Sequence, residues 1–303
     1  MKFISPKTDF AFKKIFGGDD SKDILISFLN AILYSGHNTI QDLEIIDPYS
    51  PGGVVELKDT YLDVQAVLDD QTKVIIEMQV LNVDSFEKRV VYNLCKTYSN
   101  QLKSGHSYAR LNPVIALTIT DFVLFPHTEK IITHFRFREE KEKFEYENGK
   151  LAMFFVELPK FNKELAELET ITDKWIYFLK EAPTLAAIPS NMSAVPELEK
   201  ALQIANQAGL SSEELERLKR QELFWLSQRD DLNSATRRAE AEGLQRGLEQ
   251  GLEQGLEQGL EQGREEEKKA IARQCLSQGL PIETIIAITQ LTAEQIENLR
   301  GTN

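Results

Sequence analysis

Hydrophobic and polar residues alternate along residues 61–81, YLDVQAVLDDQTKVIIEMQVL. The alternation has a period of two on both sides of residues 69–72, and it predicts a β-hairpin with one apolar and one polar, acid-bearing face. If the strands pair symmetrically about Asp70, Asp63 lies directly opposite Glu77, and a register slip of two residues keeps both side chains on the polar face. The stretch therefore predicts two carboxylates that converge on one surface.

Two converging carboxylates have a functional and a structural interpretation. They can share a Mg²⁺, a cation that takes oxygen ligands at about 2.0–2.1 Å and is normally held by one or two carboxylates together with phosphate and water. This is the arrangement that phosphodiester hydrolysis needs. The structural alternative is a half-exposed hairpin whose outer face is polar because it faces water. The residues of the hairpin alone leave both interpretations open.

Several motifs resemble one enzyme family. Asp63, followed after a 14-residue interval by Glu77-Met78-Gln79 behind an apolar Val-Ile-Ile, resembles the metal-binding core of the PD-(D/E)XK nuclease superfamily. Other segments resemble its transposase-related branch, the recombination-promoting nuclease (Rpn) family: KTDFAFKKIFG at 7–17, the helix with Arg89, Tyr92 and Tyr98, and FFVELPKF at 154–161. The resemblance covers residues 1–181 and, more loosely, the tail.

The order of the predicted elements agrees with that resemblance. We expect a helical segment over 8–34 with a break at 17–18, a strand at 43–46, the hairpin, an amphipathic helix over 85–105, a buried strand at 113–120, an edge strand at 131–138, an apolar strand at 151–158 and a helix over 173–181. The expected fold is α/β (α+β), with a restriction-endonuclease-like αβββαβ core around a mixed central sheet, followed by a mostly helical C-terminal region.

The resemblance implies a metal-dependent DNA endonuclease that uses Mg²⁺, with Mn²⁺ or another divalent cation as alternatives. Asp63 and Glu77 would carry the metal, and the backbone carbonyl of Met78 would be an additional ligand. The metal would activate a water and neutralise charge developing on the attacked phosphate. Asp9 matches a recurrent acid of the opening motif and would supplement the metal site. The favoured role of Asp9 from its position alone is to cap the first helical turn.

Gln79 departs from the lysine in the superfamily's name. A neutral amide cannot supply the positive charge that a lysine brings to that position. The Rpn-like branch accepts glutamine there, so we assign Gln79 to the catalytic set as the residue that orients the water. Lys88 or Arg89 would provide the missing charge from the next helix. The alternative is a catalytically weak or inactive DNA-binding or scaffold protein that assembles through its C-terminal region.

The helix over 85–105 also carries the candidate DNA contacts. Lys88, Arg89, Tyr92 and Lys96 recur on one side of it, and a scissile phosphate needs cations and aromatic surfaces nearby. The alternative is an ordinary solvated helix face. An RNase would use the same chemistry, and nothing in the sequence addresses recognition of a 2′-hydroxyl.

Charge and cysteine content narrow the class of protein. The net charge of −13 argues against nonspecific coating of nucleic acid, although residues 239–303 hold 12 acidic and 6 basic residues, nearly half of the excess. Cys95 and Cys275 are far apart, which favours a reducing, cytoplasmic compartment over a disulfide framework. The dispersed histidines exclude a typical zinc spacing, and no apolar window predicts a signal peptide or membrane segment. We expect a cytoplasmic protein with DNA as its partner, which would allow association with the nucleoid.

The C-terminal part divides into three segments. Residues 182–242 predict a linker followed by helices, 243–266 hold the repeat with four perfect Gly-Leu-Glu-Gln copies, and 267–303 form a short helical tail. A period of four residues drifts by about 40° per repeat around a helix and favours right-handed winding with a partner. Small residues permit close approach, so a homo-oligomer, specifically a dimer, is one interpretation and an unstructured spacer the other. The tail fits either a helix-turn-helix DNA contact or, as the favoured alternative, a protein-binding end.

Overall fold

The computed structural model describes residues 1–47, 49–50, 60–146 and 150–300. The chain divides into two compact units, Met1–Ser227 and Gln228–Asn303.

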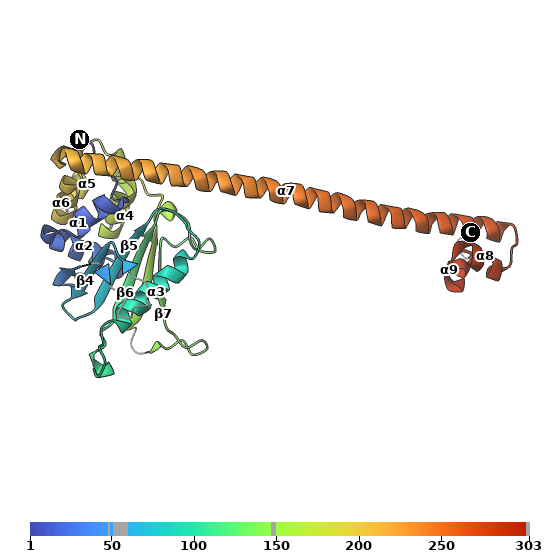
Figure 1. Cartoon of the computed structure of the whole chain (residues 1–303), viewed down its shortest axis with the longest axis horizontal. Helices are drawn as coiled ribbons and strands as arrows, with labels where there is room; N and C mark the ends of the chain where they lie inside the picture. Colours follow the sequence, from blue (N-terminus) through green and yellow to red (C-terminus); the bar gives the residue numbers. More distant parts are fainter. Residues whose placement is uncertain (48, 51–59, 147–149, 301–303) are drawn as a thin grey trace. The chain divides into compact units, whose positions relative to one another are not determined.

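A six-stranded mixed sheet forms the centre of the first unit (Figure 1). In spatial order its strands are β1 (Leu43–Ile46), β4 (Val64–Leu68), β5 (Lys73–Gln79), β6 (Val114–Thr120), β8 (Leu151–Glu157) and β7 (Ile132–Arg136). Strands β5, β6 and β8 are parallel, whereas the other pairs are antiparallel. A separate two-stranded sheet pairs β2 (Tyr49–Ser50) with β3 (Thr60–Tyr61). The mixed sheet confirms the predicted fold class.

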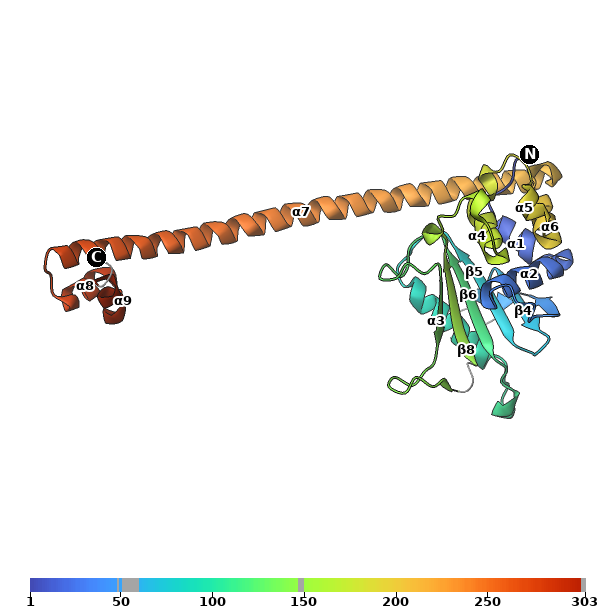
Figure 2. The same cartoon turned by 180° about the vertical axis from the view of Figure 1, so that it is seen from behind.

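Helices cover both faces of the sheet (Figure 2). The helices of this unit are α1 (Asp9–Phe16), α2 (Lys22–Leu33), α3 (Phe86–Ser99), α4 (Ile171–Glu181), α5 (Ser190–Ser193) and α6 (Pro196–Ile204). Short 3₁₀ turns lie at Asp19–Ser21, Tyr108–Arg110, Leu158–Lys160, Leu165–Glu167, Ala182–Thr184 and Gln207–Gly209. The larger core packs α1, α2, α4 and α6 against one face, and a smaller core packs α3 against the other.

The first helix begins and ends as its sequence suggests, with one difference. Thr8 Oγ1 accepts a hydrogen bond from Ala11 N at 3.3 Å, so Thr8 is the N-cap. Asp9, the residue favoured for capping on sequence grounds, is instead the first helical residue, which leaves its carboxylate available to other partners. The helix ends at Phe16, before the predicted Gly17-Gly18 break.

The central hairpin has the predicted register but not the predicted exposure. Val64 pairs with Ile76 and Ala66 with Val74, which is symmetric about Asp70. The face expected to meet water is covered, because Ile75 is only 2% exposed and packs in the α3 core. The structural alternative, a hairpin whose polar face meets water along its length, is therefore not observed, since α3 lies over that face. At the open end of the hairpin, the side chains of Asp63 and Glu77 are 17% and 12% exposed.

The first unit extends beyond residue 181, where the nuclease-like domain was expected to end. Leu198 and Leu202 of α6 are fully buried in the larger core. Leu218, in the second turn of the next helix, is 2% exposed and belongs to the same core. Part of residues 182–242, which were expected to form a linker and helices, thus contributes to the hydrophobic core of the first unit.

A long helix, α7 (Ser212–Ser277), carries the whole tetrapeptide repeat. Six glycines at a helix-interior cost of about 1 kcal/mol each would oppose this conformation in isolation. Local pairs offset part of that cost, including Gln245 Nε2 to Glu249 Oε1 at 3.0 Å and Arg246 to Glu242 at 3.1 Å. The repeat is helical in the structure. The alternative of an unstructured spacer is not observed.

The end of α7 packs with two short helices, α8 (Ile282–Thr289) and α9 (Ala293–Arg300). Ala272, Ile285 and Ile296 are fully buried in a small core that joins these helices. A Thr-x-x-Gln capping box precedes α9: Thr292 N donates to Gln295 Oε1 at 2.8 Å and Gln295 N to Thr292 Oγ1 at 3.2 Å. Among the described residues, no helix is both long and apolar enough to span a membrane.

Candidate nuclease site

The candidate site lies at the open end of the hairpin, where β5 reaches the carboxyl edge of the parallel strands. The chain bends at Asp63 just before β4, and Asp63 N donates to Ile76 O at 3.2 Å. The Asp63 carboxylate turns back onto the neighbouring strand, because Oδ2 accepts from Met78 N at 2.7 Å. This contact ties the Asp63 carboxylate to the residue that follows Glu77, while the convergence of the Asp63 and Glu77 carboxylates stays a prediction.

The carbonyl of Met78 points toward the same edge as Asp63. Lys73 N donates to Pro113 O and Gln79 O accepts from Asp121 N, so odd-numbered residues of β5 direct their backbone groups toward β6. Backbone groups alternate along a strand, and those of Met78 therefore face the β4 side, beyond the last β4 pair at Val64. The predicted carbonyl ligand thus faces the edge where the Asp63 carboxylate lies.

Helix α1 adds a second acid and a cation to Asp63. Lys13 Nζ lies 2.7 Å from Asp9 Oδ1 and 3.7 Å from Asp63 Oδ1. Asp9 and Asp63 also share a hydrogen bond. Burial and, to a smaller extent, the neighbouring Asp9 raise the pKa of Asp63 to about 7, against the lowering effect of the Met78 amide. For Asp9, burial opposes ionisation, but the hydrogen bonds from Lys13 and Asp63 outweigh it and lower the pKa.

Helix α3 holds the second predicted ligand. Asn93 Nδ2 donates to Glu77 Oε1, and Arg89 Nε lies 3.9 Å from Glu77 Oε2. Burial raises the pKa of Glu77, whereas Arg89 and Asn93 act in the opposite direction. Asn93 Oδ1 is buried and has no hydrogen-bond partner within the described part of the chain. Glu77 is therefore positioned by side chains of α3, while Asp63 is positioned by α1 and β5.

Gln79 contacts the guanidinium that the sequence analysis offered as a replacement charge. Arg89 Nη2 donates to Gln79 Oε1 at 2.5 Å, and Gln79 Nε2 donates to Leu81 O at 2.7 Å. Arg89 also lies over the Phe86 ring at 5.3 Å. The amide of Gln79 thus holds Arg89 within reach of Glu77.

The remaining candidate DNA contacts separate into exposed and buried side chains. Lys88 and Arg89 are exposed at the start of α3. Lys96 is 5% exposed and lies over the half-buried Tyr92 ring at 6.0 Å. The expected row of surface cations therefore consists of its first two members, since Lys96 belongs to the packed side of the helix.

The donor chemistry of the site fits a hard divalent cation. Asp63 and Glu77 are carboxylates with raised pKa values, and burial disfavours their charged forms when no cation is bound. A cation at this edge would favour those charged forms, and the Met78 carbonyl adds a third oxygen of the type that Mg²⁺ prefers. Within residues 1–47, 60–146 and 150–300, no three acidic, histidine or cysteine side chains already form a metal cluster. The acids are instead paired with Lys13, Asn93 and Arg89.

Sequence reasoning missed three residues of the site. Lys13 lies four positions after Asp9 on α1, and Asn93 lies four positions after Arg89 on α3, so helical spacing could have indicated both. Gln221 of α7, which forms hydrogen bonds with Asp9 and with Phe10 N, had no local signal because 211 positions separate it from Phe10.

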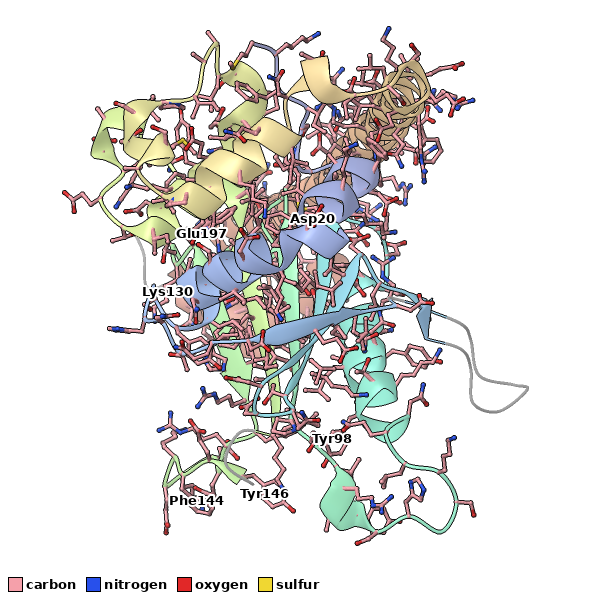
Figure 3. All side chains as sticks on the ribbon, turned by 90° about the vertical axis from the view of Figure 1, so that its left-hand side faces the viewer. Asp20, Tyr98, Lys130, Phe144, Tyr146 and Glu197 are labelled. Atoms are coloured by element: carbon pink, nitrogen blue, oxygen red, sulfur yellow. The ribbon has the colours of Figure 1, made fainter. Side chains whose placement is uncertain are left out.

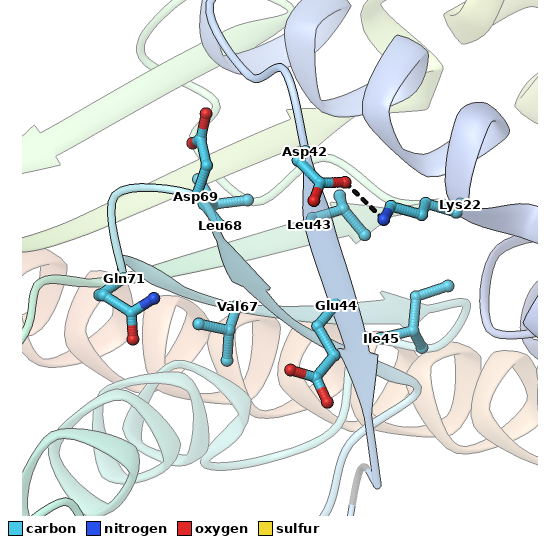
Figure 4. A pocket seen from close by; sticks show the side chains of 9 residues that line it. All are labelled: Lys22, Asp42, Leu43, Glu44, Ile45, Val67, Leu68, Asp69 and Gln71. Carbon is cyan, nitrogen blue, oxygen red and sulfur yellow. Dashed lines mark ion pairs between the residues drawn. The ribbon is translucent and has the colours of Figure 1, made fainter.

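A cavity of about 400 Å³ lies elsewhere, along β1 and β4 near the hairpin turn (Figure 4). Lys22 forms an ion pair with Asp42 there, and Asp69 and Gln71 line the turn side. The cavity contains none of the candidate site residues. The acids of the candidate site lie at the opposite, open end of the hairpin, so the hollow at the turn is a separate feature.

Comparison with known families gives two matches. A family model described as a PD-(D/E)XK nuclease family transposase matches residues 6–235. A second model, described as the C-terminal HTH domain of the Rpn/YhgA-like nuclease family, matches residues 265–301. No curated protein and no solved structure matches significantly. The first match includes the start of α7, and the second assigns the tail to the helix-turn-helix alternative that the sequence analysis had ranked lower.

Proposed function

We propose that this chain, which belongs to the PD-(D/E)XK nuclease family of transposases, cleaves DNA by metal-dependent hydrolysis of phosphodiester bonds. The observation that carries the proposal is the attachment of the Asp63 carboxylate to Met78 N, at 2.7 Å, directly beside Glu77. Asp63, Glu77 and the Met78 carbonyl would hold Mg²⁺ or Mn²⁺. The bound cation would supply an activated water and would neutralise charge on the attacked phosphate.

The chain's own side chains supply the other functions. Arg89 provides the positive charge that the family's lysine would bring, and Gln79 holds its guanidinium at the end of β5. Lys88 is exposed one position earlier on α3 and would contact the DNA backbone. Asp9, through its hydrogen bond with Asp63, keeps that carboxylate oriented and is available as a supplementary ligand.

Cleavage of supercoiled, linear and single-stranded DNA by the wild type beside Asp63→Ala tests this function. We expect wild-type protein to convert plasmid at millimolar Mg²⁺ or Mn²⁺, and the variant to lose this activity. Titrating either cation should raise the unfolding temperature of the wild type, and the rise should disappear in Asp63→Ala and Glu77→Ala. If DNA stays intact and the cations leave unfolding unchanged, the protein is a non-catalytic scaffold; cleavage of RNA alone would instead assign an RNase.

We also propose that α7 pairs with a second copy of itself through its repeat. Leu244, Leu248, Leu252, Leu256 and Leu260 are between 58% and 76% exposed. Apart from adjacent residues and the backbone of the helix itself, no described atom lies within 4 Å of the position that a Cβ would take on the repeat glycines, so another backbone can approach there. With about 100° per residue, the middle of the Gly-Leu seam lies roughly 150° from each glutamate, and the acids would face away from a partner.

Analytical ultracentrifugation tests this pairing with two matched triple variants. Replacing Leu248, Leu252 and Leu256 by Gln should convert a dimer into a monomer. Replacing Glu249, Glu253 and Glu257 by Gln changes the far side of the same helix and should leave the dimer intact. A monomeric wild type, or equal loss in both variants, would contradict pairing through the seam.

The helix-turn-helix match makes the C-terminal unit a second candidate DNA contact. In such units the second helix commonly enters the major groove. Here α9 exposes Glu294 and Glu297 and has one cation in its last turn, Arg300, whereas Lys268, Lys269 and Arg273 lie at the end of α7. We therefore assign contacts with the DNA phosphate backbone to the end of α7 rather than to α9. Replacing Lys268, Lys269 and Arg273 by Ala should weaken DNA binding and make it less dependent on salt.

A further inference from the structure

The first turns of α7 pack directly on α1, the helix that carries Asp9. Lys14 of α1 forms an ion pair with Glu214 of α7. The guanidinium of Arg217 lies over the Phe10 ring at 5.5 Å, and Leu218 is buried in the core. These contacts lie on successive turns of α7, so they fix which of its side chains face the candidate site.

Gln221, one turn further along α7, reaches the beginning of α1 with both ends of its amide. Its Oε1 accepts a hydrogen bond from Phe10 N at 3.3 Å. Its amide also lies within hydrogen-bonding reach of the Asp9 carboxylate, an acceptor to which only Nε2 can donate. Phe10 N is one of the N-terminal amides of α1 that no carbonyl within the helix can satisfy. One side chain of α7 thus completes the N-terminus of α1 and restrains its first acid.

We propose that Gln221 is a positioning residue of the nuclease site, which holds Asp9 against Asp63 and makes the start of α7 part of the catalytic unit. The inference rests on the proposed function for its consequence in cleavage, but its structural content concerns Asp9 alone. Lys13, the other partner of Asp9, is a flexible side chain that also approaches Asp63. The planar amide of Gln221, fixed at both ends, is the contact that can set the direction of the Asp9 carboxylate.

Two substitutions separate this role from simple capping. Gln221→Glu keeps an oxygen that can accept from Phe10 N but loses the donor to Asp9, whereas Gln221→Ala loses both. Gln228→Ala is the matched control, since Gln228 is an exposed glutamine of the same helix. If Gln221 only caps α1, Gln221→Glu should behave like the wild type. If it positions Asp9, both substitutions should lower kcat about tenfold or more with little change in KM, because small misplacements at a reacting centre are costly.

A double-mutant cycle with Asp9→Asn gives the decisive measurement. In that background we expect Gln221→Ala to change kcat less than about twofold, since the carboxylate it acts through is already gone. The cycle is repeated on the unfolding-temperature rise produced by Mn²⁺, which needs no cleavage. Additive losses, or a Gln221→Glu variant equal to wild type, would overturn the inference.

The two readouts keep this inference distinct from the proposed function. If the wild type does not cut DNA but Gln221→Ala and Asp9→Asn are non-additive in the Mn²⁺ response, the proposed nuclease activity fails and the positioning role stands. If the wild type cuts and the cycle is additive, the positioning role fails and the nuclease stands. A wild type without any Mn²⁺ response and without cleavage would overturn both.

Discussion

The nuclease-like unit and the repeat of α7 are stabilised by different kinds of contact. In the first unit, the large apolar side chains lie in two cores and the site acids have polar partners on α1, α3 and β5. In the repeat, the leucines lie exposed and the described contacts are between residues four positions apart. The positions of side chains in the first unit therefore depend on contacts between residues distant in sequence. In the repeat they depend on contacts between residues four positions apart.

The aromatic cluster around Trp175 should give the largest contrast between the regions. Trp175 is fully buried, packs against Phe16 and Phe28, and donates from Nε1 to Ser27 Oγ at 3.2 Å. Trp175→Ala should lower the free energy of unfolding of the first unit by about 3–5 kcal/mol. Leu252→Ala in the repeat should change it by less than about 0.5 kcal/mol. Chemical denaturation followed by circular dichroism measures both, and equal effects would break the comparison.

The next effect depends on pH and concerns the buried acid of the site. Because the folded-state pKa of Asp63 is about 7 and the reference value is 3.8, the ionised form costs stability as pH rises from about 4 through 7. Asn can still donate to Asp9 and accept from Met78 N. Asp63→Asn, measured in EDTA, should therefore be more stable than wild type by roughly 2 kcal/mol above pH 7, with the difference vanishing below pH 4. A difference independent of pH would contradict this prediction.

Arg89 and its neighbour Lys88 should affect different kinetic constants. Arg89 contacts Gln79 and Glu77, whereas Lys88 is exposed beside it. Arg89→Ala should lower kcat about tenfold, because it removes charge next to the reacting phosphate. Lys88→Ala should mainly raise KM, because a backbone contact contributes to binding. Steady-state cleavage of a short DNA duplex measures kcat and KM separately. If both variants raise KM without lowering kcat, Arg89 does not act at the reacting phosphate.

The smallest effect lies within the repeat and should have the opposite sign to a core mutation. In protein dilute enough to keep α7 unpaired, Gly255→Ala should stabilise the local helix by about 1 kcal/mol, because glycine is the poorer helix former. Amide hydrogen exchange across residues 247–262 should then slow by about fivefold. Gln254→Ala, a change between two good helix formers, is the control and should alter exchange little. If amide exchange is unchanged in Gly255→Ala, the intrinsic helix propensity of glycine does not determine the local stability of this helix.

The sequence predicts those parts of the site that depend on local periodicity. Period-two alternation was sufficient for the hairpin register. It could not reveal that α3 covers Ile75, because a buried inner strand and a half-exposed one share the same alternation over a few residues. The burial of Lys96 was unexpected for a related reason, since lysines usually mark the solvated side of a helix.

Contacts between distant segments were beyond the reach of the sequence pattern. Asn93 binds Glu77 from the following helix, and Gln221 approaches Asp9 from a helix assigned to another region. The exposed aromatic side chains near the tip of residues 137–146, which include Phe144 and Tyr146, likewise gave no periodic signal (Figure 3). The positions of Asn93 and Gln221 follow from packing of the whole unit, which a window of a dozen residues does not contain.

The tetrapeptide repeat gives α7 an adjustable length. Each copy corresponds to twelve nucleotides, so gain or loss of a copy preserves the reading frame. It would lengthen or shorten the helix by about 6 Å and rotate everything beyond it by roughly 40° about the axis. Because the inserted residues touch no core, neither terminal fold would have to repack. Gain or loss of copies would in this way change the length of α7 and the rotation about its axis in fixed steps.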